Sequence, residues 1–461
     1  MLECAFFIKD HKKRMKTPEL LSPAGTYKNM QYAFAYGADA VYAGQPRYSL
    51  RVRNNDFTLE NLKKGIAEAH RFGKKFFVAS NLMPHNAKLK TYIADMEPVV
   101  AMNPDALIMA DPGLIMMVKE RWPEQTIHLS VQANTVNYAA VKFWQSVGIE
   151  RVILSRELSL DEIEEIKQQC PEMELEVFVH GALCIAYSGR CLLSGYMNHR
   201  DPNQGTCTNA CRWEYGVHKG EENDAGDIVK AENSGTGKIE QPVMFNPLTA
   251  KTSDEIVLLE EANRPGELMP MFEDEHGTYI MNSKDLRAIQ HVQRLTEIGV
   301  DSLKIEGRTK SHYYTARTAQ IYRQAIDDAA KGKDFNMGLM HTLDGLANRG
   351  YTEGFYRRHV PEEYQNYAQG SSISTRQKFV GEVIADESKD GFLAFEVKNK
   401  FSMGDSVELM YPGGSTQFIV DEMQDFHGTP VEVAKGSGHK VKIKSPVDGV
   451  SPLGLLMINM E

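Results

Sequence analysis

From residue 19 to residue 308, short apolar runs alternate with longer segments in which apolar residues recur at helical spacing. The runs are rich in Val, Ile, Leu and Phe, which is typical of parallel strands covered by helices on both faces. Eight such β-α units predict an α/β fold with a TIM-like (β/α)8 barrel. The eight runs are ELLSPAG (19–25), DAVYAGQ (39–45), KKFFVASN (74–81), DALIMAD (105–111), IHLSVQAN (127–134), RVILSREL (151–158), ELEVFVHGA (174–182) and SLKIEGR (302–308).

The helical segments carry their own start signals. In SLDEIEEIKQQC, Ser159 followed by Glu162 forms a capping-box pattern that predicts a helix beginning there. A ninth strand-like run, TYIMNS at 278–283, is one more than a closed eight-stranded barrel needs. The sequence therefore does not decide which of the last runs form the final strands of the barrel.

The alternation stops after the seventh run, which divides the chain into further parts. We expect a cysteine-bearing insertion at 181–215, followed by a polar, Gly-rich and mobile excursion at 216–270. Residues 309–376 begin with a helix and form a linking region, and residues 1–18 are expected to be an extension outside the barrel. From 377 to 461, short strand-like runs between Gly, Asp and Pro turns predict a small C-terminal β-barrel.

Composition narrows the class of protein. No run of about 18 apolar residues is present, so a membrane span is not expected. The first residues lack the order of a secretory signal, so we expect a cytoplasmic protein with reduced thiols. The net charge of −10 argues against a protein that coats nucleic acid indiscriminately, but a local basic site remains compatible with it.

Polar residues gather where the predicted strands end, which is where barrels of this type build their active sites. Arg156 stands beside Glu157, and SLKIEGR places Lys304, Glu306 and Arg308 at a spacing of two. An arginine can bind a carboxylate or a phosphate through two parallel hydrogen bonds. Each of these groups has a structural ion pair as its alternative. The full set of polar strand ends is Ser22, Gln45, Arg47, Asn81, Asp111, Gln132, Asn134, Arg156, Glu157, His180, Glu306 and Arg308.

Four of the six cysteines crowd into the insertion with the spacing C-x6-C-x15-C-x3-C: Cys184, Cys191, Cys207 and Cys211. Four thiolates brought together suit zinc or an iron–sulfur cluster, and four buried apolar cysteines are the alternative. Only the last pair has the spacing that zinc sites favour. The small and hydroxylated neighbours of the cysteines favour iron–sulfur slightly, because backbone N–H groups can then approach the sulfurs.

The segment EVFVHGALCIAYSGRCLLS (176–194) resembles the signature of the collagenase-like peptidase family U32, and LLSPAG, DAVYAG, LKIEGR and RGYTEGF extend the likeness. The segments AFAYGADAVYAGQPRYSLRVRNN and DPNQGTCTNACRWEYGV are similar to the branch of the family that acts on tRNA. This resemblance implies an iron–sulfur protein required for 5-hydroxyuridine at the wobble position. It also implies dependence on prephenate and not on dioxygen, with a 4Fe–4S cluster on the four cysteines named above.

If prephenate binds, as the resemblance implies, the chemistry of the polar strand ends suggests which of them would contact it. Prephenate is a dicarboxylate, and Arg156 and Arg308 are the expected cationic groups that bind it. Glu306, Glu157 or His180 would then move a proton.

The expected macromolecular partner is tRNA, through an anticodon loop whose bases are already unstacked. Basic and aromatic residues alternate in RYSLRVRNN, where Arg47, Arg51 and Arg53 are predicted to bind phosphates. The stretch from 308 to 323 has the same character and contributes Lys310. For that second stretch, a helix with its tyrosines packed inward is an equal alternative.

Two other functions are compatible with parts of the sequence. A peptidase is suggested by the family label and by Cys184 following His180, but the chain has no G-x-S-x-G or H-E-x-x-H motif. One cysteine nucleophile would also leave three neighbouring cysteines unexplained. The other alternative is a non-catalytic scaffold that presents tRNA or a partner enzyme through the C-terminal domain.

Overall fold

The computed structural model describes most of the barrel, parts of the insertion and most of the C-terminal domain. The described residues are 16–49, 56–82, 84, 86–182, 186–187, 190–191, 215–222, 228–230, 256–261, 268–274, 277–280, 285–348, 350–357, 377–389, 391–436, 438–447 and 452–460.

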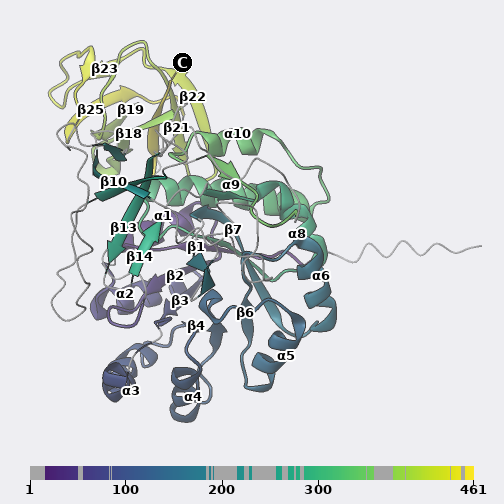
Figure 1. Cartoon of the computed structure of the whole chain (residues 1–461). Helices are drawn as coiled ribbons and strands as arrows, with labels where there is room; N and C mark the ends of the chain where they lie inside the picture. The colour runs from purple at the N-terminus through teal and green to yellow at the C-terminus, as the bar shows by residue number, and fades with distance from the viewer. Residues whose placement is uncertain are drawn as a thin grey trace, which may run out of the picture.

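Eight parallel strands close into a barrel, as the apolar runs predicted (Figure 1). Each strand pairs with the next, and β16 closes the ring by pairing with both β1 and β7. The barrel strands are β1 (Glu19–Pro23), β2 (Ala40–Gly44), β3 (Lys75–Ala79), β4 (Ala106–Met109), β5 (Ile127–Leu129), β6 (Arg151–Ile153), β7 (Glu174–Ala182) and β16 (Ser302–Ile305).

Helices cover the outside of the barrel, one after each strand. The helices are α1 (Tyr27–Ala35), α2 (Leu59–Arg71), α3 (Asn86–Val100), α4 (Pro112–Arg121), α5 (Tyr138–Ser146), α6 (Leu160–Gln169), α8 (Val292–Ile298) and α9 (His312–Ala330). The capping box of Ser159 and Glu162 is formed at the start of α6. Helix α9, which we expected in a linking region, packs against α1 and α8 and completes the barrel as its eighth helix.

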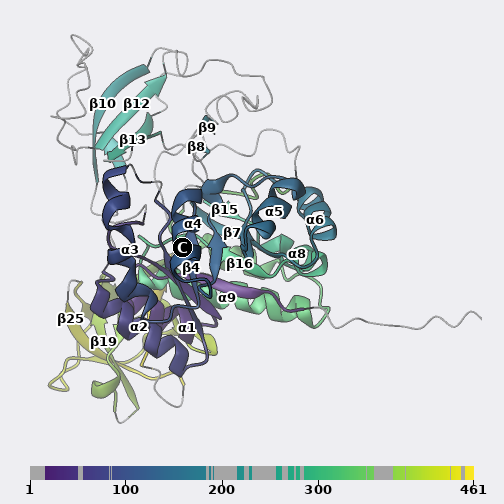
Figure 2. The same ribbon diagram turned by 90° about the horizontal axis from the view of Figure 1, so that it is seen from below.

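The surplus run near residue 280 lies outside the barrel. Strand β14 (Gly277–Ile280) belongs to an antiparallel sheet within the insertion, with strand order β11-β10-β12-β13-β14. The other strands of this sheet are β10 (Tyr215–Glu222), β11 (Ile228–Lys230), β12 (Ile256–Glu261) and β13 (Leu268–Asp274). The range expected to be a mobile excursion therefore contains a sheet, which Figure 2 shows standing apart from the barrel.

Two short strands after the insertion extend the sheet beyond β7, outside the closed ring of eight strands. Strand β15 (Asp285–Arg287) pairs antiparallel with β7 and parallel with β17 (Tyr351–Thr352). Helix α10 (Gly338–Asp344) lies between α9 and β17 along the chain.

The C-terminal domain is a separate antiparallel half-barrel, which confirms the predicted change of architecture near residue 377. Its strand order is β22-β21-β26-β18-β19-β25-β23, and no described pairing closes β22 onto β23. The strands are β18 (Gln377–Val383), β19 (Phe392–Val397), β21 (Ser406–Tyr411), β22 (Gly414–Ile419), β23 (Met423–Gln424), β25 (His439–Lys444) and β26 (Leu455–Asn459), with a separate pair β20 (Phe401–Ser402) and β24 (Val433–Ala434).

The half-barrel packs on α1 and α9, and its contact with the barrel is partly ionic. Arg317 of α9 is fully buried and donates two hydrogen bonds, at 2.9 and 2.8 Å, to the two carboxylate oxygens of Glu408 on β21. Tyr36 at the end of α1 donates to the carbonyl groups of Met410 and Leu453. A bidentate pair fixes orientation as well as distance, so the two domains have a defined arrangement.

The barrel interior contains a charged layer near the amino-terminal ends of its strands. The Nζ atom of Lys304 lies 2.7 Å from Glu176 Oε1, and Arg151 Nη1 lies 2.6 Å from Glu19 Oε1 and 3.2 Å from Glu176 Oε2. Burial lowers the pKa of Lys304 more than Glu176 raises it. Burial opposes the charge of Arg151 as well, but its carboxylate neighbours outweigh this and raise the pKa of Arg151.

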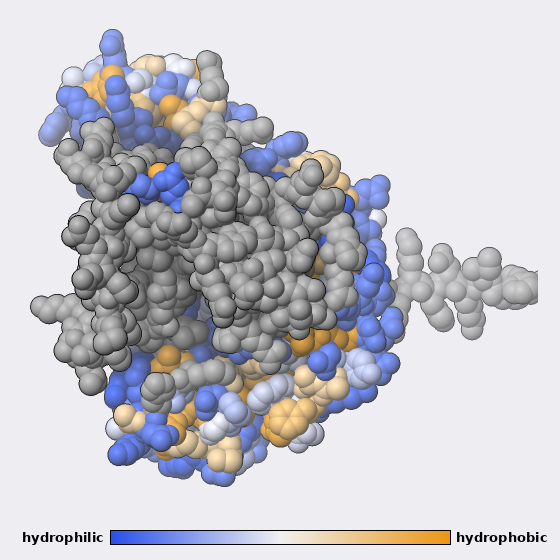
Figure 3. Space-filling view, viewed as in Figure 1, coloured by the Kyte–Doolittle hydropathy of each residue, from blue (hydrophilic) through white to orange (hydrophobic). Residues whose placement is uncertain are grey.

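The coloured parts of the surface in Figure 3 are largely hydrophilic, with apolar side chains near α4 and α5. The larger exposed apolar residues of this region include Met116, Phe143 and Val147. Among the described residues, no helix is long and apolar enough to cross a membrane.

Candidate functional site at the barrel mouth

Arg156 reaches across the carboxyl-terminal end of the barrel. It follows β6, passes over Phe178 of β7 with its guanidinium carbon 3.7 Å from the ring centroid, and meets Glu306 after β16. The Nη2–Oε2 distance is 2.9 Å, and both side chains are about 15% exposed, at 16% and 15%. The pair therefore joins two strands that are not neighbours, and it stays accessible from the mouth.

The Arg156 guanidinium retains free donors. Within the described part of the chain, Nη2 is the only one of its nitrogens that forms a hydrogen bond. A guanidinium carries five N–H donors in a fixed plane. Arg156 can thus bind an anion while Glu306 and Phe178 hold its orientation.

Arg308 provides a second guanidinium at the end of β16, and it is more deeply set. Its Nη1 donates to Ser49 Oγ at 2.7 Å, and its guanidinium carbon lies 5.9 Å from the ring centroid of Tyr42. The close approach depends on Gly44, the last residue of β2. A Cβ atom there would lie 2.4 Å from Arg308 Nη1 and 2.7 Å from Ser49 Oγ.

Tyrosine hydroxyls support the backbone beneath these groups. Where β7 and β16 end, their register shifts between Lys304 and Ile305, and carbonyl groups accept hydrogen bonds from side chains. Gly181 has φ +108°, and a Cβ atom there would lie 2.4 Å from the carbonyl oxygen of Glu306. The hydroxyl donors and their carbonyl acceptors are Tyr42 to Ile305, Tyr314 to Glu306, Tyr322 to Val179 and Tyr356 to Phe178.

His180 lies behind the site wall and not in the mouth. It is 1% exposed, and its ring packs against Tyr314, Tyr322 and Tyr351. Burial lowers the pKa of His180 to about 3, so the imidazole is neutral at neutral pH. This position argues against the expected role of His180 in direct proton transfer to a substrate.

Some of the remaining strand-end residues bond to one another through their side chains, and others bond to the backbone. Glu157 accepts a hydrogen bond from Ser155, while Arg156 turns away from it toward Glu306. Asn81 donates to Gln132 Oε1 at 3.2 Å.

Other polar strand ends hold the backbone in place. Asp111 caps α4 by accepting from the backbone N–H of Leu114. Gln45 accepts from the backbone N–H groups of Arg47 and Tyr48. Lys304, expected beside Glu306, lies instead in the interior with Glu176, because the strand ends at Ile305.

Most of the predicted cluster ligands fall outside the described residues. Cys184, Cys207 and Cys211 are among these, and Cys191 is described only as part of β9 (Arg190–Cys191), which pairs with β8 (Ala186–Tyr187). Cys170, which is not one of these four cysteines, is buried at the carboxyl-terminal end of α6. The iron–sulfur and zinc alternatives therefore stay predictions.

The predicted RNA-binding residues have different positions. Arg47 is exposed and pairs with Asp95 at 2.7 Å, whereas Arg51 and Arg53 lie outside the described residues. Lys310 is half-buried, with Nζ 5.6 Å from the ring centroid of Tyr314.

The aromatic residues of α9 face inward. Tyr313 and Tyr314 are buried, as is Arg317. They are therefore unable to stack on bases, and the alternative of inward packing is correct for this stretch.

Sequence reasoning missed Phe178, Ser49 and Tyr42 as parts of the site. The inward direction of Phe178 follows from strand periodicity, because Glu176 and Phe178 alternate with Val177 and Val179 in β7. The sequence around Ser49 does not indicate its role, because that role depends on a hydrogen bond from Arg308, which lies far along the chain.

Comparison with known proteins agrees with this architecture. The model of peptidase family U32 matches residues 25–366, and the model of the U32 C-terminal domain matches residues 375–456. The chain belongs to peptidase family U32. The boundary between the two matches lies close to the start of the half-barrel.

Relatives of this U32 chain carry two kinds of name. It is 64% identical to tRNA hydroxylation protein P of Escherichia coli, over 97% of this chain and 98% of that protein. It is 60% identical to tRNA hydroxylation protein P of Haemophilus influenzae, over 96% of each chain. A collagenase of Porphyromonas gingivalis is 27% identical, over 93% of this chain and 95% of that protein.

Proposed function

We propose that this chain is a tRNA-modifying enzyme that takes part in 5-hydroxylation of the wobble uridine. The observation that carries the proposal is 64% identity along nearly the whole chain to a protein named for tRNA hydroxylation. Because tRNA is the substrate, the proposal places the protein in the cytoplasm.

The finer chemistry of the proposal is prephenate-dependent and independent of dioxygen. The cofactor is a 4Fe–4S cluster held by Cys184, Cys191, Cys207 and Cys211, with zinc as the alternative metal for these thiolates. When bound to these thiolates, the cluster would supply electron-transfer or Lewis-acid chemistry. The cysteine spacing and the family resemblance support this assignment.

At the mouth, the two guanidinium groups suit a small dicarboxylate. The free N–H groups of Arg156 bind one carboxylate, and Arg308 supplies the second cation. Glu306 orients Arg156, and its carboxylate is also the group that we propose to accept or donate a proton at the mouth. Glu157 is the second carboxylate at this position.

The RNA-binding surface of the proposal combines described and undescribed cations. Arg47, with Arg51 and Arg53 that follow it in sequence, binds phosphates, and Lys310 adds a cation from the loop after β16. This local basic surface is compatible with a net charge of −10, because only the charge near the anticodon loop acts at close range.

The function is tested by measuring 5-hydroxyuridine in tRNA by mass spectrometry. The tRNA comes from cells in which this chain is the sole source of the activity, expressed either as wild type or as Arg156→Ala. We expect Arg156→Ala to lower the modification about 10- to 100-fold, because one charge-assisted contact is lost. Iron and sulfide content should stay at the wild-type level.

The matched control is Arg121→Ala, which removes an exposed arginine paired with Glu97 at 3.1 Å on the outside of the barrel. It should leave the modification unchanged. Wild-type levels of 5-hydroxyuridine in Arg156→Ala would remove that residue from the site. Absence of the modified base in cells with the wild-type chain would overturn the proposed function.

A peptidase is the second candidate, favoured by the collagenase among the relatives. The buried position of His180 speaks against it as the base for a cysteine nucleophile. Cleavage of gelatin by purified protein that persists after anaerobic removal of the cluster would favour the peptidase. No cleavage is expected.

A further inference from the structure

Two lysines of the half-barrel point away from its core on strand β25. Lys440 and Lys442 alternate there with Val441 and Ile443, which are buried in the core of the domain. Because side chains alternate between the two faces of a strand, both lysines lie on the outer face. Lys440 is exposed and Lys442 is half-buried. Residues at this spacing are about 7 Å apart along a strand.

Two further lysines come from the turns beside the start of β25. Lys400 follows β19 and Lys435 follows β24, and both side chains are exposed. The two turns pack together, since a Cβ atom at Gly436 would lie 3.4 Å from the backbone nitrogen of Lys400. We name the group the lysine edge, and it consists of Lys400, Lys435, Lys440 and Lys442.

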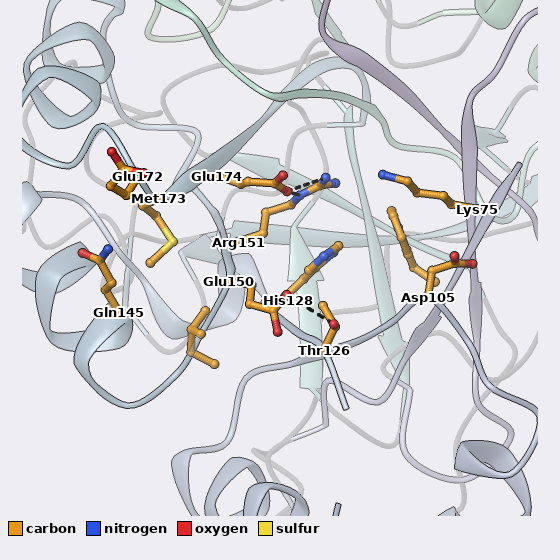
Figure 4. Close-up of a pocket in the computed structure, with 12 residues that line it drawn as sticks. Lys75, Asp105, Thr126, His128, Gln145, Glu150, Arg151, Glu172, Met173 and Glu174 are labelled. Carbon is orange, nitrogen blue, oxygen red and sulfur yellow. Dashed lines mark hydrogen bonds and ion pairs between the residues drawn. The ribbon is translucent and has the colours of Figure 1, made fainter. Parts of the chain in front are cut away.

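The charges of the lysine edge are not neutralised by neighbouring carboxylates. Within the part of the chain that the structure describes, its four lysines form no ion pair, whereas the nearby Lys398 lies 2.7 Å from Glu396 and 3.6 Å from Glu382. At the amino-terminal end of the barrel, Lys75 is also paired, with Glu19 at 2.9 Å, on the wall of the cavity shown in Figure 4. A paired lysine must lose its carboxylate before it binds an anion, and the lysines of the edge need not.

An aromatic ring lies beside the two lysines of β25. The Nζ atoms of Lys440 and Lys442 are 5.8 and 5.1 Å from the ring centroid of Phe426. Phe426 is partly exposed, in the turn after β23. Basic side chains interleaved with an aromatic ring are typical of surfaces that bind nucleic acids, because the cations contact phosphates while the ring contacts a base or a sugar. An acidic peptide would leave the ring without a partner.

The lysine edge lies at the end of the half-barrel that is next to the barrel mouth. Helices α1 and α9 begin at the mouth, and Lys28 and His312 in their first turns both contact Glu382 of β18. Across three adjacent strands, Glu382 is opposite Glu396, and Glu396 is opposite Lys440. Neighbouring strands are about 4.8 Å apart, so this row leads from the mouth end of the helices to the lysine edge within about 10 Å.

We propose that the lysine edge binds phosphates of the RNA stem whose loop enters the barrel mouth. The inference rests on the proposed function, because it takes tRNA as the partner. Successive phosphates along one strand of an RNA stem are spaced much as Lys440 and Lys442 are. Contacts of this kind fix the position of the RNA and carry no sequence information. The half-barrel therefore strengthens the binding of tRNA, and the choice of base is left to the mouth.

The test measures how the full-length protein binds a fluorescently labelled anticodon stem-loop RNA, by anisotropy at several sodium chloride concentrations. The variant combines Lys440→Gln with Lys442→Gln. We expect it to weaken binding about tenfold near physiological salt and to reduce the slope of log K against log salt by about 2, because each lost phosphate contact releases about one counterion fewer. Binding of the single-stranded loop alone, which lacks the stem phosphates, should change by less than about twofold.

The matched control combines Lys331→Gln with Lys333→Gln, which removes two exposed lysines at the same spacing just after α9. Helix α9 has 19 residues, so these lysines lie about 28 Å from its mouth end. The control should bind the stem-loop as the wild type does. A second variant, Lys400→Gln with Lys435→Gln, tests the same edge through exposed turn residues and should lower the salt slope in the same way.

The outcomes separate this inference from the proposed function. Wild-type binding by the β25 variant, or equal weakening in the control, would overturn the inference and leave the proposed function intact. Equal weakening for the stem-loop and for the single-stranded loop would overturn it as well, since the contacts would not be to the stem. Competition by polyglutamate as effective as that of the stem-loop at equal charge would show a general anion surface. A wild-type protein that binds neither RNA would contradict the proposed function itself, and the inference with it.

Discussion

At the scale of single residues, the function of each arginine follows from how many of its guanidinium N–H groups are already bonded to neighbouring residues. Arg151 and Arg317 are buried and held by carboxylates, so their charge serves the fold. Among the described residues, Arg156 has one carboxylate partner and an aromatic ring beneath it, which leaves donors for a ligand. The free donors, and not the charge alone, distinguish a binding arginine from a structural one.

The second guanidinium of the mouth depends on a residue without a side chain. We predict that Gly44→Ala lowers hydroxylation, because the added methyl group would displace Arg308 from Ser49. The cost of such overpacking is about 1–3 kcal/mol. The modified-base assay and thermal unfolding should be measured together.

The control for this variant is Gly113→Ala in α4, where a Cβ atom would meet a single side chain among the described residues, Asp111, with its Oδ1 at 3.2 Å. Thermal stability and hydroxylation should both be retained there. If Gly44→Ala kept full activity, Arg308 would not need its present position for the reaction.

At the scale of elements, the loop that carries Arg156 and Glu157 is fixed by the helix that follows it. Ser159 accepts from the N–H of Glu162, and the Glu162 carboxylate accepts from the N–H of Ser159. We predict that Ser159→Ala lowers the free energy of unfolding by about 1 kcal/mol, the usual cost of losing such a cap. Urea denaturation followed by circular dichroism measures this change.

Ser159→Thr should restore most of that stability, because threonine keeps the hydroxyl that accepts from the N–H of Glu162 and donates to the Glu162 carboxylate. Equal losses for the alanine and threonine variants would mean that packing of Ser159, and not capping, is what matters.

The elements were largely predictable because their signals are local. All eight barrel runs and the start of α6 follow from apolar spacing and from capping residues within a few positions. The surplus run near 280 was ambiguous, because a short strand-like sequence does not say which sheet it joins. The run forms β14, which pairs with β13, and this pairing places it in the sheet of the insertion.

The site was predictable only in part, because its pairs connect distant residues. Sequence marked Arg156 and Glu306 as polar strand ends, but their partnership spans 150 positions. It depends on barrel closure, which brings β16 beside β7. The inward packing of Arg317 was equally hidden, since its partner Glu408 lies in the other domain.

At the scale of the whole molecule, the half-barrel is joined to the barrel by ionic contacts that respond to pH. Glu382 of β18 pairs with Lys28 of α1, and with His312 of α9 at 2.9 Å. Burial alone would raise the pKa of Glu382, but these two partners outweigh burial and lower the pKa to about 2. Since an unfolded glutamate titrates near 4.5, the ionised side chain stabilises the folded form above that pH.

We therefore predict that stability falls as pH decreases from about 4.5 toward 2, because the folded protein must then protonate a carboxylate that it holds ionised. Glu382→Gln should lower the thermal midpoint at pH 7 and make it less dependent on pH across that window. The control is Glu422→Gln, in an exposed pair with Lys444 on the same domain, which should keep the wild-type profile. A wild-type acid profile in Glu382→Gln would show that the domain contact rests on Arg317 and the apolar packing around it, and not on this carboxylate.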